Sequence, residues 1–437
     1  MKHSPNSPIL LTASLHVDEA RKAIANLVNE LLQESTLLND PADIETVSLD
    51  QAINRILAQD LLSPIDVPSA DNSAMDGYAF DGKCLQDKTD VTLKIVGTAL
   101  AGKPFIGKIG QGECLKIMTG ALMPADCDTV IPQEFTSSSN QETICFASNQ
   151  LKAGENRRLR GEDLQMGKAA IPAGRLLRPS DLGLAASLGI SSLQVRRKLK
   201  VAILSSGDEL RSLGQNLDPG SIYDSNRYSL TGMLNRLNID IIDCGIVRDN
   251  PDSLKEAFID AASKADVLIS SGGVSVGEAD FTKQIMQELG DVGFWKIAMR
   301  PGRPMAFGTL KPIPGKTPAR KTLFFGLPGN PVAVMVTFYQ FVRSALLQLN
   351  GASLTEPPLV QAISESAIRK KPGRTEFQRA ILGRNEAGRP SVRLTGSQGA
   401  GILRSMSEAN CFVILGHEQG NIAAGELVDI ALFDGLL

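Results

Sequence analysis

Histidine is scarce in this 437-residue chain, which contains only His3, His16 and His417. None of them lies beside a GxSxG pattern or a cysteine with a suitable partner, so hydrolysis by a nucleophile triad is disfavoured. The six cysteines show no CxxC spacing, which argues against a zinc site or a disulfide framework and is typical of reduced thiols. Long apolar runs and a signal-peptide pattern are also lacking, so we expect a cytoplasmic protein without a membrane span.

An excess of basic residues is missing as well. The formal charge is −3 and the pI is near 5.8, so the chain has no basic surface for nucleic acid. Any anionic ligand must therefore be held by a few local groups. With 43% apolar and 21% charged residues, the composition is that of an ordinary globular protein, and the length indicates two to four domains.

The pattern along the chain predicts a multidomain α/β protein. A helical pattern with one apolar face, followed later by a second helical segment, predicts a discontinuous helical domain over 14–60 and 158–196. Short runs in which apolar and polar residues alternate, separated by glycines and prolines, predict a β-rich inserted domain over 61–157. Residues 352–437 contain further short alternating runs, which predict a C-terminal β-barrel domain.

Residues 197–351 alternate strand and helix patterns, which predicts a three-layer, doubly wound α/β domain. The expected strands are 200–206, 239–247, 266–271, 294–299 and 322–327. Ligands of open α/β sheets bind beyond the carboxyl ends of the strands, so the residues that follow these strands are the first candidates for a site.

Acidic residues follow three of these strands. Asp208 and Glu209 come after the first, Asp249 after the second, and Asp280 lies beyond the third. Any one of them is more simply read as an acid that stabilises a helix N-terminus. Several carboxylates on one rim repel each other unless a cation neutralises them, and oxygen ligands suit Mg²⁺. Their coincidence therefore favours a metal site.

A glycine-rich loop follows the third strand. Gly272, Gly273 and Gly277 permit positive φ angles, so consecutive N–H groups there can bind an anion before the helix that begins near Phe281. The alternative is a tight βα turn without a ligand. The loop is neither a GxGxxG dinucleotide motif nor a Walker loop.

Cations lie near the expected rim. Lys296, Ala298 and Arg300 recur with period two, which places them on one face of a strand, and Arg303 follows across a Pro-Gly turn. An exposed strand edge would show the same spacing. Asn330 is expected to cap the following helix, with Pro331 at its first position. Carboxylates, cations and helix N-termini together indicate an anionic ligand bridged by a metal.

The β-rich region contains a second polar cluster, formed by Asp71, Thr119 and Asp163 with their neighbours. Each of these residues could belong to a turn without any function. Nothing in the sequence brings this cluster to the rim of the same chain, but a second subunit could do so.

Seven motifs carry a resemblance to a known family. They are PSADNSAMDGYAF, MTGALMP, RGED, SSGDEL, SGGVSVGEADFTK, KIAMRPGRPMAFG and LPGNPVAV. Together they resemble the molybdopterin molybdenumtransferases, and the C-terminal domain of gephyrin is similar. The resemblance covers nearly the whole chain.

The resemblance implies a homodimer whose active site is shared between the α/β domain of one chain and the inserted domain of the other, with dimerisation through the helical domain. The implied reaction hydrolyses adenylylated molybdopterin with Mg²⁺, releases AMP and places molybdenum from molybdate on the dithiolene. It implies transient contact with an adenylyltransferase and with recipient molybdoenzymes.

The resemblance also assigns roles. Asp249 and Asp280 would hold the metal and nucleotide, Glu209 would lie at the pterin pocket, and Lys296 with Arg300 would hold the oxyanion. Asp71, Thr119 and Asp163 would act from the partner chain. The remaining substrate-binding residues would be Gly272, Gly273, Ser275, Gly277, Pro328, Asn330 and Arg379.

Two residues depart from the family pattern. Arg300 stands where many relatives have lysine, which keeps the charge but changes its shape, and Ala400 stands where serine is common. Two other functions stay open from the sequence. A molybdopterin adenylyltransferase has a similar α/β domain, and a gephyrin-like scaffold would need no catalysis.

Overall fold

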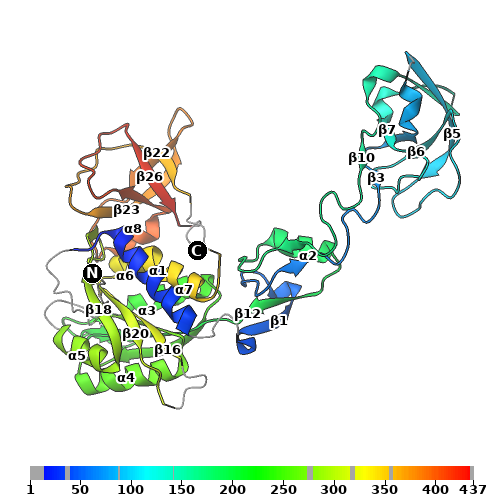
Figure 1. Ribbon diagram of the computed structural model, residues 1–437. Coiled ribbons are helices and arrows are strands. Elements are labelled where there is room, and N and C mark those ends of the chain that lie inside the picture. Colours follow the sequence, from blue (N-terminus) through cyan, green and yellow to red (C-terminus); the bar gives the residue numbers. More distant parts are fainter. Residues whose placement is uncertain are drawn as a thin grey trace, which may run out of the picture. The chain divides into compact units, whose positions relative to one another are not determined.

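A six-stranded mixed sheet with helices on both faces forms the centre of one of two units into which the chain divides (Figure 1). This main unit comprises residues up to 58, residues 174–178 and residues from 194 onward; the inserted unit comprises 59–173 and 179–193. The computed structural model describes residues 14–34, 40–86, 89–140, 142–272, 279–314, 320–353 and 358–433. The four-domain boundaries expected from the sequence remain a prediction.

The central sheet has the strand order β16-β13-β17-β21-β20-β18. The first four strands are parallel, whereas β20 and β18 each run antiparallel to their neighbours. The bounds are β13 (Lys200–Ser206), β16 (Asp240–Val247), β17 (Val267–Ser271), β18 (Gly290–Lys296), β20 (Pro304–Leu310) and β21 (Thr322–Leu327). The parallel strands confirm the α/β fold predicted from the sequence.

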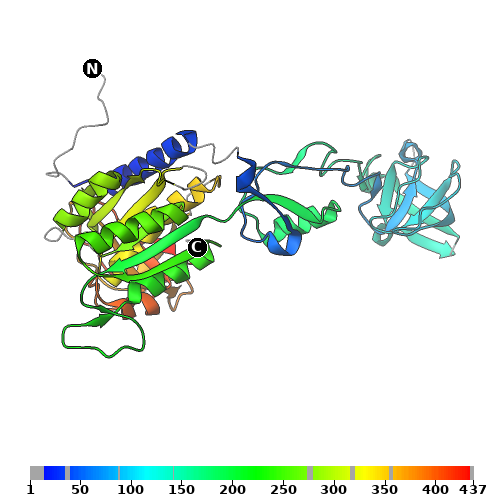
Figure 2. The same cartoon turned by 90° about the horizontal axis from the view of Figure 1, so that it is seen from below.

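Each face of this sheet is covered by its own helices (Figure 2). Val201 and Ile203 of β13 face one core, and the alternate residues Ala202 and Leu204 face the other, as the period of a strand requires. The first core includes α1 (Val17–Glu34), α3 (Ser225–Arg236), α6 (Pro331–Thr337) and α7 (Arg343–Leu349). The second includes α4 (Pro251–Lys264) and α5 (Ala279–Leu289). This arrangement confirms three layers.

Helix α1 packs into the first core through residues three or four positions apart. Ala20, Ile24 and Leu31 are buried, as the apolar pattern predicts, together with Val17 and Val28. The helix contacts α7 and the π-helical turn η6 (Phe338–Val342) that joins α6 to α7. The N-terminal helix therefore belongs to the core of the main unit.

The helical run Pro331–Leu349 is long and apolar enough to cross a membrane by length and composition. Its most apolar window is 78% buried inside the main unit, where α1 and α3 pack against it. A core helix accounts for this pattern, and the cytoplasmic location remains a prediction.

One strand differs from the sequence prediction. Residues 294–299 do not form a single strand, because β18 ends at Lys296 and Met299 N–H turns back to donate to the Ile297 carbonyl at 2.8 Å. Arg300 then belongs to β19 (Met299–Arg300), which pairs with the C-terminal domain. The prediction that Lys296, Ala298 and Arg300 share one strand face is wrong. Strand β20 was also not predicted, since prolines and glycines interrupt its pattern.

The C-terminal region forms a closed barrel in the order β23-β24-β22-β26-β25, with β25 pairing back to β23, and this confirms the predicted barrel. Its bounds are β22 (Val360–Ser364), β23 (Thr375–Arg384), β24 (Pro390–Leu394), β25 (Cys411–Leu415) and β26 (Leu427–Leu432), with α8 (Leu403–Glu408) between β24 and β25. β19 adjoins β23 at Thr375 and Glu376. The barrel thereby holds the segment that carries Arg300.

The inserted unit contains a six-stranded sheet of order β7-β4-β6-β5-β9-β8. Its bounds are β4 (Gly77–Phe80), β5 (Asp90–Ala99), β6 (Glu113–Ile117), β7 (Thr129–Pro132), β8 (Ser137–Asn140) and β9 (Thr143–Ala147). Small pairs join β2 (Leu61–Leu62) to β11 (Ala169–Ile171) and β3 (Asn72–Ser73) to β10 (Arg157–Arg158), and α2 spans Pro179–Ser187. The β-rich texture of this region agrees with the sequence prediction.

Smaller elements complete the chain. β1 (Ile44–Ser48) pairs with β12 (Ser192–Arg196), and in the main unit β14 (Leu210–Arg211) pairs with β15 (Ile222–Tyr223). Short 3₁₀ turns lie at Pro41–Asp43, Leu49–Gln51, Gly82–Leu85, Gln133–Phe135 and Ser148–Gln150.

Candidate active site

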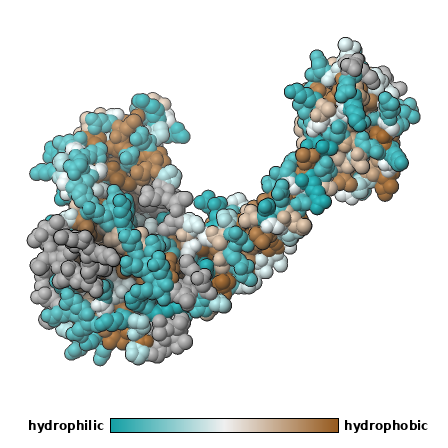
Figure 3. All heavy atoms as spheres, viewed as in Figure 1, coloured by the Kyte–Doolittle hydropathy of each residue, from teal (hydrophilic) through white to brown (hydrophobic). Residues whose placement is uncertain are grey.

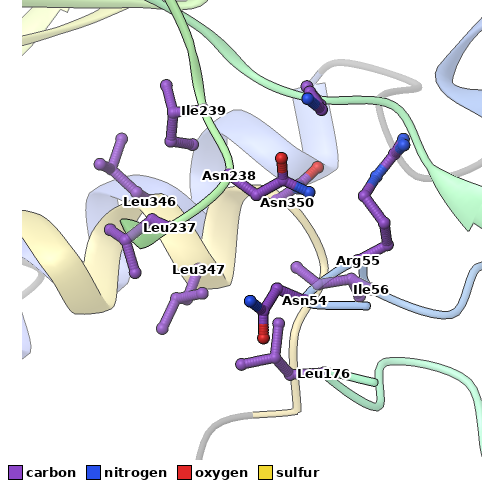
Figure 4. Close-up of a pocket in the computed structure, with 11 residues that line it drawn as sticks. Asn54, Arg55, Ile56, Leu176, Leu237, Asn238, Ile239, Leu346, Leu347 and Asn350 are labelled. Atoms are coloured by element: carbon purple, nitrogen blue, oxygen red, sulfur yellow. The ribbon is translucent and has the colours of Figure 1, made fainter. Parts of the chain in front are cut away.

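A cavity of about 860 Å³ opens in the main unit at the carboxyl ends of β13, β17 and β21. We call it the crevice; it is lined by the strand-end residues Ser206, Ser271 and Gly272, and by residues of the segments that follow them. Its size suits a cofactor-sized ligand. A second cavity, around Asn54, Asn238 and Asn350, is only about 10 Å³ and has room for one water at most (Figure 4). The crevice is therefore the candidate site.

Two strand ends approach closely at the floor of the crevice. Gly272 has φ +91°, and a Cβ atom at this position would lie 2.4 Å from the Ser206 carbonyl oxygen. Only glycine fits this backbone without displacing β13. The sequence prediction of a positive φ angle is thus confirmed at Gly272.

Three acidic side chains of the predicted rim lie together along the crevice. Asp208 and Glu209 follow β13, Asp249 follows β16, and the Asp249 N–H donates to Asp208 Oδ1 at 3.4 Å. The pKa of Asp249 is raised, first by partial burial and then by the carboxylates of Asp208 and Glu209. Like charges gathered in this way favour binding of a cation.

The remaining residues of the predicted metal and glycine-loop site cannot be placed beside this group. Gly273, Ser275 and Gly277 lie outside the described residues, and for Asp280 the structure describes the backbone of α5 alone. In the part of the chain that the structure describes, no group of three or more His, Cys, Asp or Glu side chains is arranged to hold a metal ion. The donor set around Asp249 nevertheless consists of carboxylate oxygens, which suit a hard cation.

The cations are distributed differently from the prediction. Arg303 lines the crevice, whereas Lys296 and Arg300 do not. Lys296 is half-buried at the end of β18, and Arg300 is exposed on β19 beside the C-terminal barrel. The turn that separates Arg300 from Arg303 explains this, because it returns the chain to the sheet as β20.

Arg379 is 1% exposed and is not part of the crevice wall. Its guanidinium donates to the carbonyl oxygens of Ser397, Gln398 and Gly399 at 3.3, 3.3 and 2.9 Å and to Ser405 Oγ at 3.0 Å. Burial, followed by the nearby charge of Arg300, lowers its pKa to about 10. These bonds do not support direct contact between Arg379 and a substrate; they hold the glycine-rich loop of the barrel.

That loop reaches the crevice directly. Ala400 and Gly401 line it, and the Ala400 carbonyl accepts a hydrogen bond of 3.1 Å from the Val332 N–H at the start of α6. Pro328 and Asn330 line the crevice next to this contact. Asn330 occupies the N-cap position of α6, as predicted, but its side chain makes no capping bond. The C-terminal barrel and the sheet thus contribute to one wall.

The inserted unit brings its three predicted residues into neighbouring segments. Asp71 Oδ1 accepts from the Arg160 N–H at 2.8 Å, while Thr119 donates through its N–H and its hydroxyl to Asp76 Oδ1, both at 2.7 Å. The Thr119 hydrogen bonds lower the pKa of Asp76. Asp163 is exposed on the segment that also carries Arg160. Asp71 and Asp76 therefore each have a local hydrogen-bonding partner.

The sequence prediction missed several crevice residues. Tyr223, Asp224 and Asn226 line it from β15 and from the start of α3. The sequence could have indicated them, because the polar residues 224–226 follow the apolar pair Ile222 and Tyr223 and come directly at the start of a helical pattern. Arg303, in contrast, is expected near the rim as the cation after the Pro-Gly turn, and it does line the crevice.

Comparison with known proteins identifies the family. Residues 15–189 match the MoeA N-terminal region (domain I and II), residues 202–348 match a probable molybdopterin binding domain, and residues 361–433 match the MoeA C-terminal region (domain IV). The chain is 44% identical over 398 residues to a molybdopterin molybdenumtransferase of Haemophilus influenzae, across 91% of this chain and 96% of that protein. The chain belongs to the MoeA family. Membership confirms the resemblance seen in the motifs.

Other similar proteins match along nearly the whole of this chain. The crystal structure of a molybdopterin biosynthesis moeA protein from Pyrococcus horikoshii OT3 has a TM-score of 0.77 at 26% identity, covering 96% of this chain and 100% of that one. Gephyrin of Dictyostelium discoideum is 29% identical over 457 residues, across 95% of this chain and 62% of that protein. The MoeA assignment confirms the expectation of a transferase of molybdenum cofactor biosynthesis.

Proposed function

We propose that this chain inserts molybdenum from molybdate into adenylylated molybdopterin, in an Mg²⁺-dependent reaction that releases AMP. Water adds to a phosphorus of the phosphoanhydride, one P–O bond breaks, and AMP leaves. The dithiolene, as the dithiol, then binds molybdate through both sulfurs: two Mo–S bonds form, one Mo–O bond breaks, and the displaced oxo leaves as water with the two thiol protons. Relatives named molybdopterin molybdenumtransferase along nearly the full chain support this reaction.

The observation that carries the proposal is the composition of the crevice wall. The acidic residues Asp208, Glu209 and Asp249 and the cation Arg303 line the same cavity. A pterin nucleotide needs both, because its phosphates attract cations directly and attract carboxylates only through a bridging metal ion. Gly272, Pro328 and Asn330 line the same cavity.

Asp249 would hold the Mg²⁺ ion together with Asp280, and Glu209 would lie at the pterin pocket. The raised pKa of Asp249 supports this role, because a bound cation would relieve the repulsion from Asp208 and Glu209. When bound, Mg²⁺ would neutralise charge that develops on the phosphoanhydride oxygens. Gly273, Ser275 and Gly277 are proposed to bind phosphate through the backbone that continues from Gly272.

Lys296 and Arg300 are proposed to hold molybdate. Because both lie outside the crevice wall, the oxyanion would bind apart from the nucleotide. Arg379 lies within electrostatic reach of Arg300, and its charge adds to the positive potential there. We assign Arg379 the positioning of the loop that ends at Ala400 and Gly401 rather than contact with substrate.

The proposed active site is shared in a homodimer, with Asp71, Thr119 and Asp163 supplied by the partner chain. Exposed apolar side chains on the inserted unit suit such a contact, and Figure 3 shows apolar side chains among hydrophilic ones on its surface. These exposed residues include Ile106 at 96% and Met166 at 62%. Transient contact with an adenylyltransferase and with recipient molybdoenzymes remains part of the proposal.

The two alternative functions have less support. An adenylyltransferase would account for the α/β domain, but the matches to the MoeA N-terminal and C-terminal regions extend far beyond it. A scaffold without catalysis would not need the gathered carboxylates of the crevice.

The test mixes the purified chain with adenylylated molybdopterin, Mg²⁺ and molybdate and follows AMP. We expect AMP release that requires both Mg²⁺ and molybdate. Tight binding of the pterin nucleotide without AMP release under any metal condition would reject the proposal. Net formation of adenylylated pterin from ATP would favour the adenylyltransferase.

A further inference from the structure

Asn226 connects two chain segments at the wall of the crevice. It is 9% exposed, it lies in the first turn of α3, and it lines the cavity. Its Nδ2 donates to Ser271 Oγ at 2.8 Å and to the Gly329 carbonyl oxygen at 2.7 Å. One amide group therefore links the end of β17 to the turn between β21 and α6.

The orientation of this amide follows from its partners. The Gly329 carbonyl can only accept a hydrogen bond, so the group that faces it at 2.7 Å must be the NH₂ and not the oxygen. Oδ1 then points away from both loops, and it is buried without a hydrogen-bond partner among the described residues. An unpaired buried acceptor is unfavourable, so an apolar side chain would fill this space at a lower cost than asparagine. The two hydrogen bonds that Nδ2 donates explain why asparagine is present.

The two loops that Asn226 joins are the loops that face the ligand. Gly272 follows Ser271 directly, and Asn330 follows Gly329; both line the crevice. The loops are close, since a Cβ atom built on Gly329 would lie 4.0 Å from Gly272 Cα. Gly272 N–H also donates to the Leu327 carbonyl at 3.2 Å, but that bond joins Gly272 to the end of β21 and does not include Gly329.

We propose that Asn226 is a positioning residue of this enzyme, which sets the separation of the Gly272 and Gly329 loops so that their backbones meet the anionic part of the ligand. The inference rests on the proposed function, since that function supplies the pterin nucleotide. Asn226 acts through the two loops and needs no contact with the reacting atoms. Its loss should lower turnover and nucleotide binding while the dependence on molybdate stays unchanged.

The test compares Asn226→Asp and Asn226→Ala with Asn235→Ala, a control at an exposed asparagine of the same helix. We expect a roughly tenfold or greater loss of kcat/KM for adenylylated molybdopterin in both Asn226 variants and none in the control. Losing two hydrogen bonds to a placed loop is the reason for that size. Melting temperatures identify any variant that fails to fold.

The pH profile separates positioning from general stability. In Asn226→Asp, the ionised carboxyl repels the Gly329 carbonyl, and protonation restores one donor. The activity of Asn226→Asp relative to wild type should therefore rise as pH falls toward 5, whereas that of Asn226→Ala should not. A ratio that stays flat with pH, in a folded variant, would overturn the proposal.

A third measurement does not depend on the chemistry. Amide hydrogen exchange of peptides covering 267–272 and 327–331 should become faster in Asn226→Ala and stay unchanged in Asn235→Ala. Equal exchange in both variants would reject the positioning role of Asn226, even if the enzyme releases no AMP. If exchange is faster in Asn226→Ala but wild type releases no AMP, the proposed function is contradicted, whereas the link that Asn226 makes between the two loops is supported.

Discussion

The crevice of the main unit and the polar cluster of the inserted unit both gather acidic residues, but in opposite electrostatic states. In the inserted unit, Asp66 accepts hydrogen bonds from the Met166 N–H and then from Arg160, and Asp76 accepts them from Thr119; these bonds lower both pKa values. Asp249 in the crevice faces other carboxylates, which add to the burial that raises its pKa. The first group is satisfied within its own chain. The second group gathers like charges, which favour binding of a cation.

The largest effect that this comparison predicts concerns Asp249. The change Asp249→Asn should lower AMP release by roughly 10²–10³-fold, the size expected when one electrostatic partner of a reacting phosphate is lost. AMP release at saturating Mg²⁺ and molybdate measures it. Asp252→Asn, an exposed acid three residues along, is the control. Near wild-type turnover in Asp249→Asn would end the metal-binding role.

The next effect separates the cations that do not line the crevice from the one that does. Lys296→Ala should require about ten- to a hundred-fold more molybdate, since a lost charge-assisted bond costs about 1.5–3 kcal/mol, with nucleotide binding almost unchanged. Arg303→Ala should instead weaken nucleotide binding. AMP release against molybdate concentration, paired with direct pterin binding, gives both values. The opposite pattern would exchange their roles.

A smaller effect tests whether the two clusters meet across a dimer. Asp71→Ala chains and Glu209→Ala chains should each be inactive, and an equal mixture should recover about a quarter of wild-type activity. Half of the dimers are then mixed, and each mixed dimer has one intact site of two. Differently tagged chains show whether mixed dimers form. If they form but release no AMP, the proposal of a shared site is wrong.

The smallest effect is on the pH dependence of stability. A raised folded pKa means that the folded state binds a proton more tightly than the unfolded chain, so Asp249 disfavours folding above its folded pKa and this cost disappears as pH falls through it. Asp249→Asn should therefore raise the free energy of unfolding at neutral pH by less than about 1 kcal/mol, because solvent screens the rim.

The inserted unit should show the opposite sign. The lowered pKa of Asp76 stabilises the folded state above the ordinary pKa, and this contribution is lost as pH falls through the folded pKa. Thr119→Ala should therefore weaken the acid-induced loss of stability. Unfolding by denaturant between pH 3 and 7 compares the two variants. Equal slopes in both would show that the two clusters do not differ.

Local pattern was enough to predict the elements on which the crevice depends. The alternation of strand and helix in 197–351 predicted the parallel strands, and acids after successive strands predicted a common rim, which Asp208, Glu209 and Asp249 form. These predictions hold because side-chain periodicity and the direction of parallel strands are local properties. The break after Lys296 was missed, since pairing of β19 with the distant β23 decides it.

The sequence by itself determined the fold class, the family motifs and the residue types available to the site. Tertiary structure alone decided which of those residues share a surface. Arg379 became a buried support for the barrel loop, and Asn226 became a link between two loops that lie 45 and 103 residues further along the chain. The physical reason is that hydrogen bonds between distant segments depend on how sheet, helices and barrel pack, and no local spacing encodes that packing.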